Sequence, residues 1–238
     1  MDKLITGARA LGIDLSAAQA ALFEAYYRAL VDWNRRINLT AITGYEEVQT
    51  KHFLDSLTVT LGARDISMDG LRVIDVGTGA GLPGIPLKIA FPHIQLVLLE
   101  ATAKKADFLR HLVRELRLEG VDIVTGRAEE IAHQPAYREQ FDLVLSRAVA
   151  SLPTLVELTL PFCAIGGRLV AQKQADALPE IDHAQRAIDL LGGRLREVIE
   201  VSVPSLPPDR RLVVIDKVSP TPPTYPRRPG IPAKRPLL

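Results

Sequence analysis

Apolar residues recur at helical spacing through the first part of the chain. Residues 16–19 have the form of a capping box, which opens a helix. Apolar side chains then follow every three or four positions, at Leu22, Tyr26, Leu30, Trp33 and Ile37. A second helix is predicted at about residues 46–61. The pattern therefore predicts a helical N-terminal extension over residues 1–65.

From residue 70 onward, short apolar runs alternate with helical patterns. Strands are predicted at residues 72–75, 95–100, 122–124, 141–145 and 168–172, with helices at 85–90, 103–118 and 152–160. A further helix at 177–191 leads to strands at 195–201 and 212–218, whose connection is too short for a crossover helix. Residues 66–218 are thus expected to form an α/β domain with a mostly parallel, seven-stranded, Rossmann-like sheet ending in an antiparallel hairpin.

The last 20 residues differ from the rest in composition. Ten of the 17 prolines lie at or after Pro204. Proline removes a backbone donor and fixes φ, so we expect residues 219–238 to form an extended or polyproline-like tail without a helix.

Overall composition is that of a soluble protein. Apolar residues make up 47% of the chain and charged residues 24%, and 29 basic residues nearly balance 28 acidic ones. No signal peptide is evident, so a cytoplasmic protein is expected. A monomer is expected because no heptads and no long unpaired edge strand are evident. The single cysteine, Cys163, excludes an internal disulfide and a cysteine-based zinc site, and its apolar surroundings predict a core residue. No metal site is expected.

A glycine-rich turn follows the first predicted strand. Gly77, Gly79 and Gly81 alternate after Val73-Ile74-Asp75-Val76, and a helix comes next. Glycines there let a ligand approach the backbone, and a helix N-terminus offers free N–H groups. Residues 79–84 formally match the dinucleotide fingerprint, which would indicate a nicotinamide-dependent oxidoreductase. However, Asp75 would lie beside the pyrophosphate, whereas a carboxylate suits the ammonium of a methionine moiety. The arrangement resembles motif I of class I methyltransferases, whose cofactor is S-adenosylmethionine.

Residues after the next strands fit a nucleoside pocket. Glu100 ends the second strand, nineteen residues after Gly81, where a carboxylate can accept both ribose hydroxyl protons. Residues 126–130 follow the third strand, where this fold usually contacts adenine. Residues 146–148, which include Arg147, follow the fourth strand and are expected to face the transferred methyl group.

Motifs that the chain lacks narrow the set of possible methyl acceptors. Enzymes that methylate exocyclic amines usually carry Asn/Asp-Pro-Pro-Tyr after the fourth strand, where this chain has Ser-Arg-Ala-Val. Attack through a pyrimidine carbon needs a cysteine nucleophile, and Cys163 lies in an unsuitable context. Guanine N7 needs no activation, because its lone pair is free. Catalysis would then consist mainly of positioning.

Local charge suggests an RNA partner. The proline-spaced tail carries four cations without an acid, Arg227, Arg228, Lys234 and Arg235. A basic helix adds Lys104, Lys105, Arg110, Arg114 and Arg117. A solvated tail without a partner would give the same composition.

Residues 75–87, DVGTGAGLPGIPL, closely resemble the RsmG family, also called glucose-inhibited division protein B. Further similar positions are Trp33-Asn34, Asn38-Leu39-Thr40, residues 52–57, 108–110 and 146–148, Gln172-Lys173 and residues 225–235. The family methylates guanosine N7 in small-subunit (16S) ribosomal RNA. The resemblance implies cofactor contacts at Gly77, Leu82, Ala128, Glu129 and Arg147, with Gly79 and Gly81 shaping the turn. Glu100 stands where many members have aspartate.

Other interpretations remain open at this point. Trp33, Asn34, Asn38 and Thr40 either pack and cap the first long helix or serve function, and His52 is either an interface residue or part of an RNA-facing surface. A small-molecule methyltransferase and a non-catalytic RNA-binding assembly factor are the alternatives to an rRNA methyltransferase.

Overall fold

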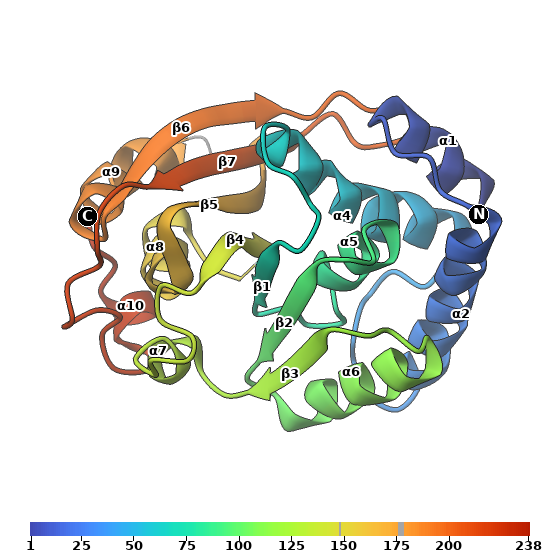
Figure 1. Ribbon diagram of the computed structural model, residues 1–238, viewed down its shortest axis with the longest axis horizontal. Helices are drawn as coiled ribbons and strands as arrows, with labels where there is room; N and C mark the ends of the chain where they lie inside the picture. Colours follow the sequence, from blue (N-terminus) through green and yellow to red (C-terminus); the bar gives the residue numbers. More distant parts are fainter. Residues whose placement is uncertain (148, 176–178) are drawn as a thin grey trace.

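The computed structural model describes residues 1–147, 149–175 and 179–238 (Figure 1). Its seven strands form one sheet in the order β3-β2-β1-β4-β5-β7-β6. All pairs from β3 to β5 are parallel, and β7 is antiparallel to both neighbours, as predicted. The strands are β1 (Arg72–Val76), β2 (Gln95–Glu100), β3 (Val121–Thr125), β4 (Phe141–Arg147), β5 (Cys163–Gln174), β6 (Gly193–Glu200) and β7 (Arg210–Lys217).

Helices cover both faces of this sheet (Figure 1). Alternate side chains of each strand point to opposite faces, so Val73 joins one apolar cluster and Ile74 the other. One cluster contains the N-terminal helices with α5 and α6, and the other contains α8 and α9. The helices are α1 (Asp2–Ala10), α2 (Ala17–Asn34), α3 (Tyr45–Glu47), α4 (Asp55–Leu57), α5 (Gly84–Ala90), α6 (Ala103–Glu115), α7 (Ala128–Ile131), α8 (Leu152–Thr159), α9 (Pro179–Leu190) and α10 (Ile231–Lys234). Of the helix predicted at 177–191, residues 177 and 178 lie outside the described residues.

The N-terminal segment packs directly on the sheet. The predicted capping box is present, since Ser16 Oγ accepts from Gln19 N and Gln19 Oε1 accepts from Ser16 N. The predicted helix at 46–61 is one helical segment, but its geometry changes along its length. It contains a π-helix over Val48–Leu54 and a 3₁₀-helix over Thr58–Ala63. The Thr50 hydroxyl donates to the Glu46 carbonyl, a side-chain bond that competes with the regular helix ladder.

The C-terminal tail corrects one prediction, because it contains a short helix and is held against the body. Gly230 adopts φ +81°, and α10 begins at the next residue with Pro232 in its first turn, where proline costs no hydrogen bond. Arg138 donates to the carbonyls of Tyr225 and Thr221, at 2.9 and 2.8 Å. The expectation of a helix-free tail was wrong, because the one proline inside this helix, Pro232, lies in its first turn, where helices tolerate it.

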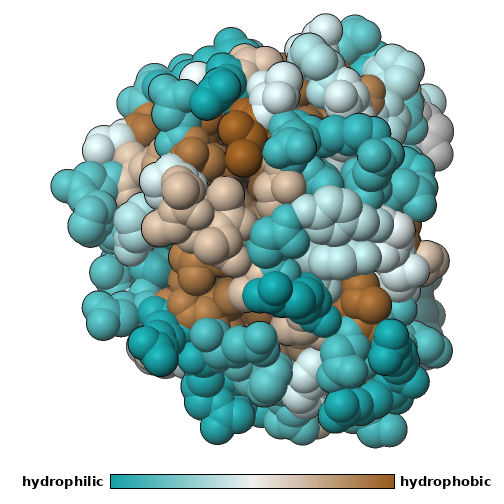
Figure 2. All heavy atoms as spheres, turned by 90° about the vertical axis from the view of Figure 1, so that its right-hand side faces the viewer, coloured by the Kyte–Doolittle hydropathy of each residue, from teal (hydrophilic) through white to brown (hydrophobic). Residues whose placement is uncertain are grey.

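On the side of the N-terminal helices, apolar side chains form a band between hydrophilic ones (Figure 2). Within the described residues, no helix is both long enough and apolar enough to cross a lipid bilayer.

Candidate active site

The glycine turn joins β1 to α5 through left-handed backbone conformations. Gly77, Gly79 and Gly81 have φ of +72°, +60° and +90°, a region that disfavours side chains. A Cβ on Gly77 would lie 2.7 Å from Val149 Cγ2, whereas the space around Gly79 is open to 4 Å. Gly77 is thus exposed but has Val149 close to where a side chain would begin, whereas Gly79 is half-buried with open space beside it. Leu82 is buried beneath the turn, and its N–H donates to the Thr78 carbonyl at 3.0 Å.

Asp75 has a different place from the one predicted. Its side chain is fully buried, and Oδ2 accepts from Thr78 Oγ1 at 2.6 Å and from Gly84 N at 2.8 Å. Burial raises the pKa of this carboxyl to about 6, although both hydrogen bonds favour its charged form. Asp75 thus holds the turn to the first residue of α5 and does not face a ligand ammonium.

Glu100 ends β2 beside the turn. Its Oε2 accepts from Gly79 N at 3.0 Å, and its Oε1 accepts from Thr102 N at 2.8 Å. Each carboxylate oxygen has a second lone pair, so two further donors can be accepted. These two free acceptor positions suit the two hydroxyl donors of a ribose, and the glycine turn suits the rest of S-adenosylmethionine.

Ala128 and Glu129 begin α7, one strand beyond Glu100. Glu129 is buried, and its Oε1 accepts from Arg127 Nη2 at 3.1 Å and from Gly230 N at 3.0 Å. The C-terminal tail therefore contacts the loop that was predicted to hold adenine. No sequence pattern signals this contact, because it joins residues 101 positions apart.

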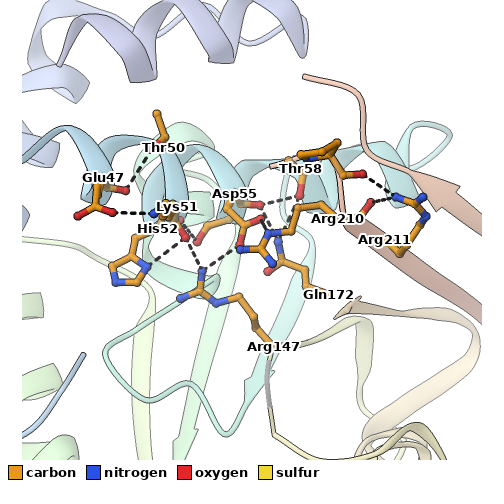
Figure 3. A network of polar contacts seen from close by, with 12 residues as sticks. Glu47, Thr50, Lys51, His52, Asp55, Thr58, Arg147, Gln172, Arg210 and Arg211 are labelled. Carbon is orange, nitrogen blue, oxygen red and sulfur yellow. Dashed lines mark hydrogen bonds and ion pairs between the residues drawn. The ribbon is translucent and has the colours of Figure 1, made fainter. Parts of the chain in front are cut away.

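Arg147 is the last residue of β4, and it points toward the N-terminal segment (Figure 3). Its Nη1 lies 3.1 Å from Asp55 Oδ2 and 3.3 Å from the Lys51 carbonyl. Arg210, at the start of β7, places Nε 3.0 Å from Asp55 Oδ1, an ion pair without hydrogen-bond alignment. One buried carboxylate thus holds two guanidinium groups from opposite sides.

These residues surround a cavity of about 570 Å³. Its lining comes from the N-terminal segment, from the ends of β4 and β5, and from the start of β7: Lys51, His52, Asp55, Arg147, Val149, Gln172, Lys173 and Arg210. Val149 lies against Gly77, so the cavity adjoins the glycine turn. Its volume is within the range of about 300–1,000 Å³ typical of ligand pockets. Sequence reasoning missed Arg210, which follows a proline-rich loop and belongs to no recognised motif.

His52 is a buried member of this cavity wall. Its Nδ1 lies 3.1 Å from the Lys51 carbonyl and must donate, so Nε2 accepts from the Thr40 hydroxyl at 2.8 Å. Burial is the largest cause that lowers the pKa of His52, to about 4, and the charge of Arg147 adds to it. The imidazole is therefore neutral near pH 7.

Acid should destabilise the protein through His52. Between pH 6.5 and 4 the unfolded chain binds a proton at this residue and the folded chain does not, so the free energy of unfolding falls as pH falls. Chemical denaturation at several pH values should show a smaller acid loss for His52→Gln, while His93→Gln, at an exposed histidine, keeps the original loss. Equal losses in all three proteins would contradict the assignment. Asp75 has the opposite effect, because its raised pKa stabilises the folded state as pH falls. The test therefore compares the acid loss of each variant with that of the unaltered protein.

Two further residues that the sequence singles out, Asn34 and Cys163, have structural roles. Asn34 has a structural role, since Oδ1 accepts from the N–H groups of Leu39 and Thr40 at the end of α2. Burial raises the pKa of Cys163 to about 12, consistent with a core residue. In the described part of the chain, no group of three acidic, histidine or cysteine side chains is placed to hold a metal ion.

The four predicted RNA-binding cations are not equivalent. Arg227 is engaged inside the protein, where its Nη2 lies 2.6 Å from Oε2 of the fully buried Glu157. Its guanidinium thus has a structural role in an internal ion pair, and an RNA contact by Arg227 stays a prediction. Arg228, Lys234 and Arg235 are exposed on the tail.

Comparison with known proteins gives consistent matches. The family model described as "GidB: rRNA small subunit methyltransferase G" matches residues 19–213. The chain is 55% identical over 238 residues to ribosomal RNA small subunit methyltransferase G of Dehalococcoides mccartyi and 46% identical over 237 residues to that of Roseiflexus sp., each covering 100% of both chains.

Solved structures match at the level of fold. The precorrin-6y C5,15-methyltransferase of Geobacter metallireducens gives a TM-score of 0.52 at 15% identity, over 76% of this chain and 91% of that one. TYW2 of M. jannaschii in complex with AdoMet gives 0.51 at 17% identity, over 68% and 76%. The fold is that of class I methyltransferases.

Proposed function

Because the chain belongs to the rRNA small subunit methyltransferase G family, we propose that it transfers a methyl group from S-adenosylmethionine to N7 of a guanosine in small-subunit ribosomal RNA. The observation that supports this proposal best is the cavity beside the glycine turn, which shares Arg147 with the predicted cofactor site and reaches Gly77 through Val149. The cavity thus gives an acceptor base direct access to the cofactor's methyl group.

The residues around the turn would hold the cofactor. Gly77 and Leu82 would contact it, with Gly79 and Gly81 shaping the turn. Glu100 would accept the ribose hydroxyl protons, and Ala128 and Glu129 would contact adenine. Arg147 lies between this site and the acceptor cavity.

S-adenosylmethionine supplies an electrophilic methyl group: the N7 lone pair forms the new bond to carbon, and the electrons of the carbon–sulfur bond pass to sulfur. No proton is removed, so the protein needs no general base, and the neutral His52 is not one. Asp55 is already paired with both Arg147 and Arg210, so its charge is not available to offset the positive charge that develops on the purine during transfer. The chain's task is therefore to hold N7 in line with the breaking bond.

We further propose that Arg228, Lys234 and Arg235 contact RNA phosphates, which would make binding weaken with salt. The exposed position of all three supports this, as does the attachment of the tail beside Glu129. In this proposal the protein acts as a monomer in the cytoplasm, where ribosomal subunits assemble.

Methyl transfer from labelled S-adenosylmethionine to small subunits lacking the modification tests the function. Mass-spectrometric mapping should find a single 7-methylguanosine in the ribosomal RNA. Arg147→Ala should lower the rate by at least about a hundredfold, by analogy with the loss of a preorganised active-site contact. Arg9→Ala, at an exposed residue of α1, should leave it unchanged. Cofactor binding without transfer to subunits or to naked RNA would instead indicate a small-molecule acceptor or a non-catalytic assembly role.

A further inference from the structure

Gln172 places an unused hydrogen-bond acceptor in the wall of the acceptor cavity. The side chain lies on β5 and is only 5% exposed. Its Nε2 donates to the Asp55 carbonyl at 2.6 Å and to Thr58 Oγ1 at 3.2 Å. A carbonyl can only accept, so the nitrogen must face it and the orientation of the amide is fixed. Oε1 is buried and has no hydrogen-bond partner among the described residues.

A buried acceptor without a donor is costly, and such atoms in folded proteins call for an explanation. Gln172 lies in the lining of the cavity, so a ligand there can supply the missing donor. The surrounding cations do not, because Arg147 and Arg210 are both held by Asp55 (Figure 3). Lys173, the next residue, is paired with Glu180 at 2.8 Å. These neighbours therefore leave the acceptor without a donor among the described residues.

The position of Gln172 in the sheet determines which edge of a bound base its side chain would contact. Gln172 pairs with Arg147 across β4 and β5, and β5 lies one strand further from the glycine turn than β4. A guanine whose N7 faces the turn directs its N1–H and 2-amino groups away from it, toward β5. Both groups are donors, whereas adenine presents an acceptor at N1. One buried acceptor at this place thus favours guanine over adenine.

Resting on the proposed function, we propose that Gln172 is a specificity-determining residue whose Oε1 accepts a hydrogen bond from the N1–H or the 2-amino group of the target guanine. Asp55 is the positioning residue for this contact, since its backbone carbonyl fixes the amide. A site built to hydrogen-bond a substrate group rejects the analogue that lacks it far more strongly than an apolar pocket rejects a change of size.

The test compares bases at the methylated position of small-subunit RNA joined from synthetic and transcribed pieces and assembled into subunits. The substrates carry guanosine, inosine, which lacks the 2-amino group, or 2-aminopurine, which lacks N1–H. Single-turnover methylation is measured for the unaltered protein, Gln172→Met and Gln185→Met, the last being a control at an exposed glutamine of α9. The unaltered protein and the control should methylate at least one analogue roughly tenfold to a hundredfold more slowly than guanosine.

In Gln172→Met, guanosine and that analogue should be methylated at rates within about threefold of each other, because the variant lacks the acceptor that distinguishes them. A merely structural role would slow all three substrates equally and leave the penalty intact, and that result overturns the proposal. Absence of any penalty in the unaltered protein overturns it as well.

If Gln172→Met fails to bind cofactor or to unfold cooperatively, Gln172→Asn, which keeps the amide but withdraws the oxygen, takes its place with the same expectation. Failure of the unaltered protein to methylate guanosine contradicts the proposed function instead.

Discussion

Replacing Arg227 with alanine should lower the free energy of unfolding by about 3–5 kcal/mol, the cost typical of breaking a buried ion pair from one side. Glu157 is fully buried on α8, and its carboxylate accepts from the backbone N–H, Nε and Nη2 of Arg227. Without the guanidinium, the carboxylate stays charged in the interior or takes up a proton, and either costs free energy. Chemical denaturation at pH 7 measures the difference.

The neighbouring residue provides a matched control. Arg228 is exposed, so Arg228→Ala should change the free energy of unfolding by no more than about 0.5 kcal/mol. Replacing both partners, Arg227→Met with Glu157→Met, should recover much of the loss, because an apolar pair leaves no buried charge. Equal stability of Arg227→Ala and Arg228→Ala would show that the tail does not contribute to the fold through this pair.

The sheet and the glycine turn could be predicted because their causes are local. Buried strands read as apolar runs, and the hairpin of β6 and β7 followed from a connection too short for a helix. Turns that need positive φ can be recognised from the glycines in the sequence. A carboxylate at a strand end, such as Glu100, can be recognised in the same way. Asp75 shows the limit of this reasoning, because sequence places a residue at a strand end but does not say which way its side chain turns.

The acceptor cavity depends on contacts between distant segments, which no local pattern records. Asp55 and Arg147 are 92 positions apart, and Gln172 meets the carbonyl of Asp55 across 117 positions. Their residue types are ordinary for a helix and for strand ends, so only the folded chain reveals that they share a cavity. The tail was mispredicted for the same reason, since the order of residues 219–238 comes from donors such as Arg138 far away in the sequence.

Gly77→Ala is expected to lower kcat/KM for methyl transfer by at least about a hundredfold, through loss of correct placement at the cofactor turn. The new Cβ would lie 2.7 Å from Val149 Cγ2, so Val149 or the turn must shift just where the cofactor site meets the acceptor cavity. Under the proposed function, the added methyl group would also take space beside the cofactor that Gly77 is proposed to contact. Calorimetry with S-adenosylmethionine should therefore show weakened binding in parallel with the slower transfer.

Gly12→Ala separates this effect from backbone strain. Gly12 has φ +75°, close to the +72° of Gly77, but a Cβ there meets nothing within 4 Å. Both variants should lose about 1–2 kcal/mol of stability, because each forces an L side chain into the left-handed region. Only Gly77→Ala should lose cofactor affinity and activity, since Gly12 lies at the end of α1, away from the turn. If the two variants lose activity equally, the loss reflects general destabilisation, and the glycine turn would have no special part in binding the cofactor.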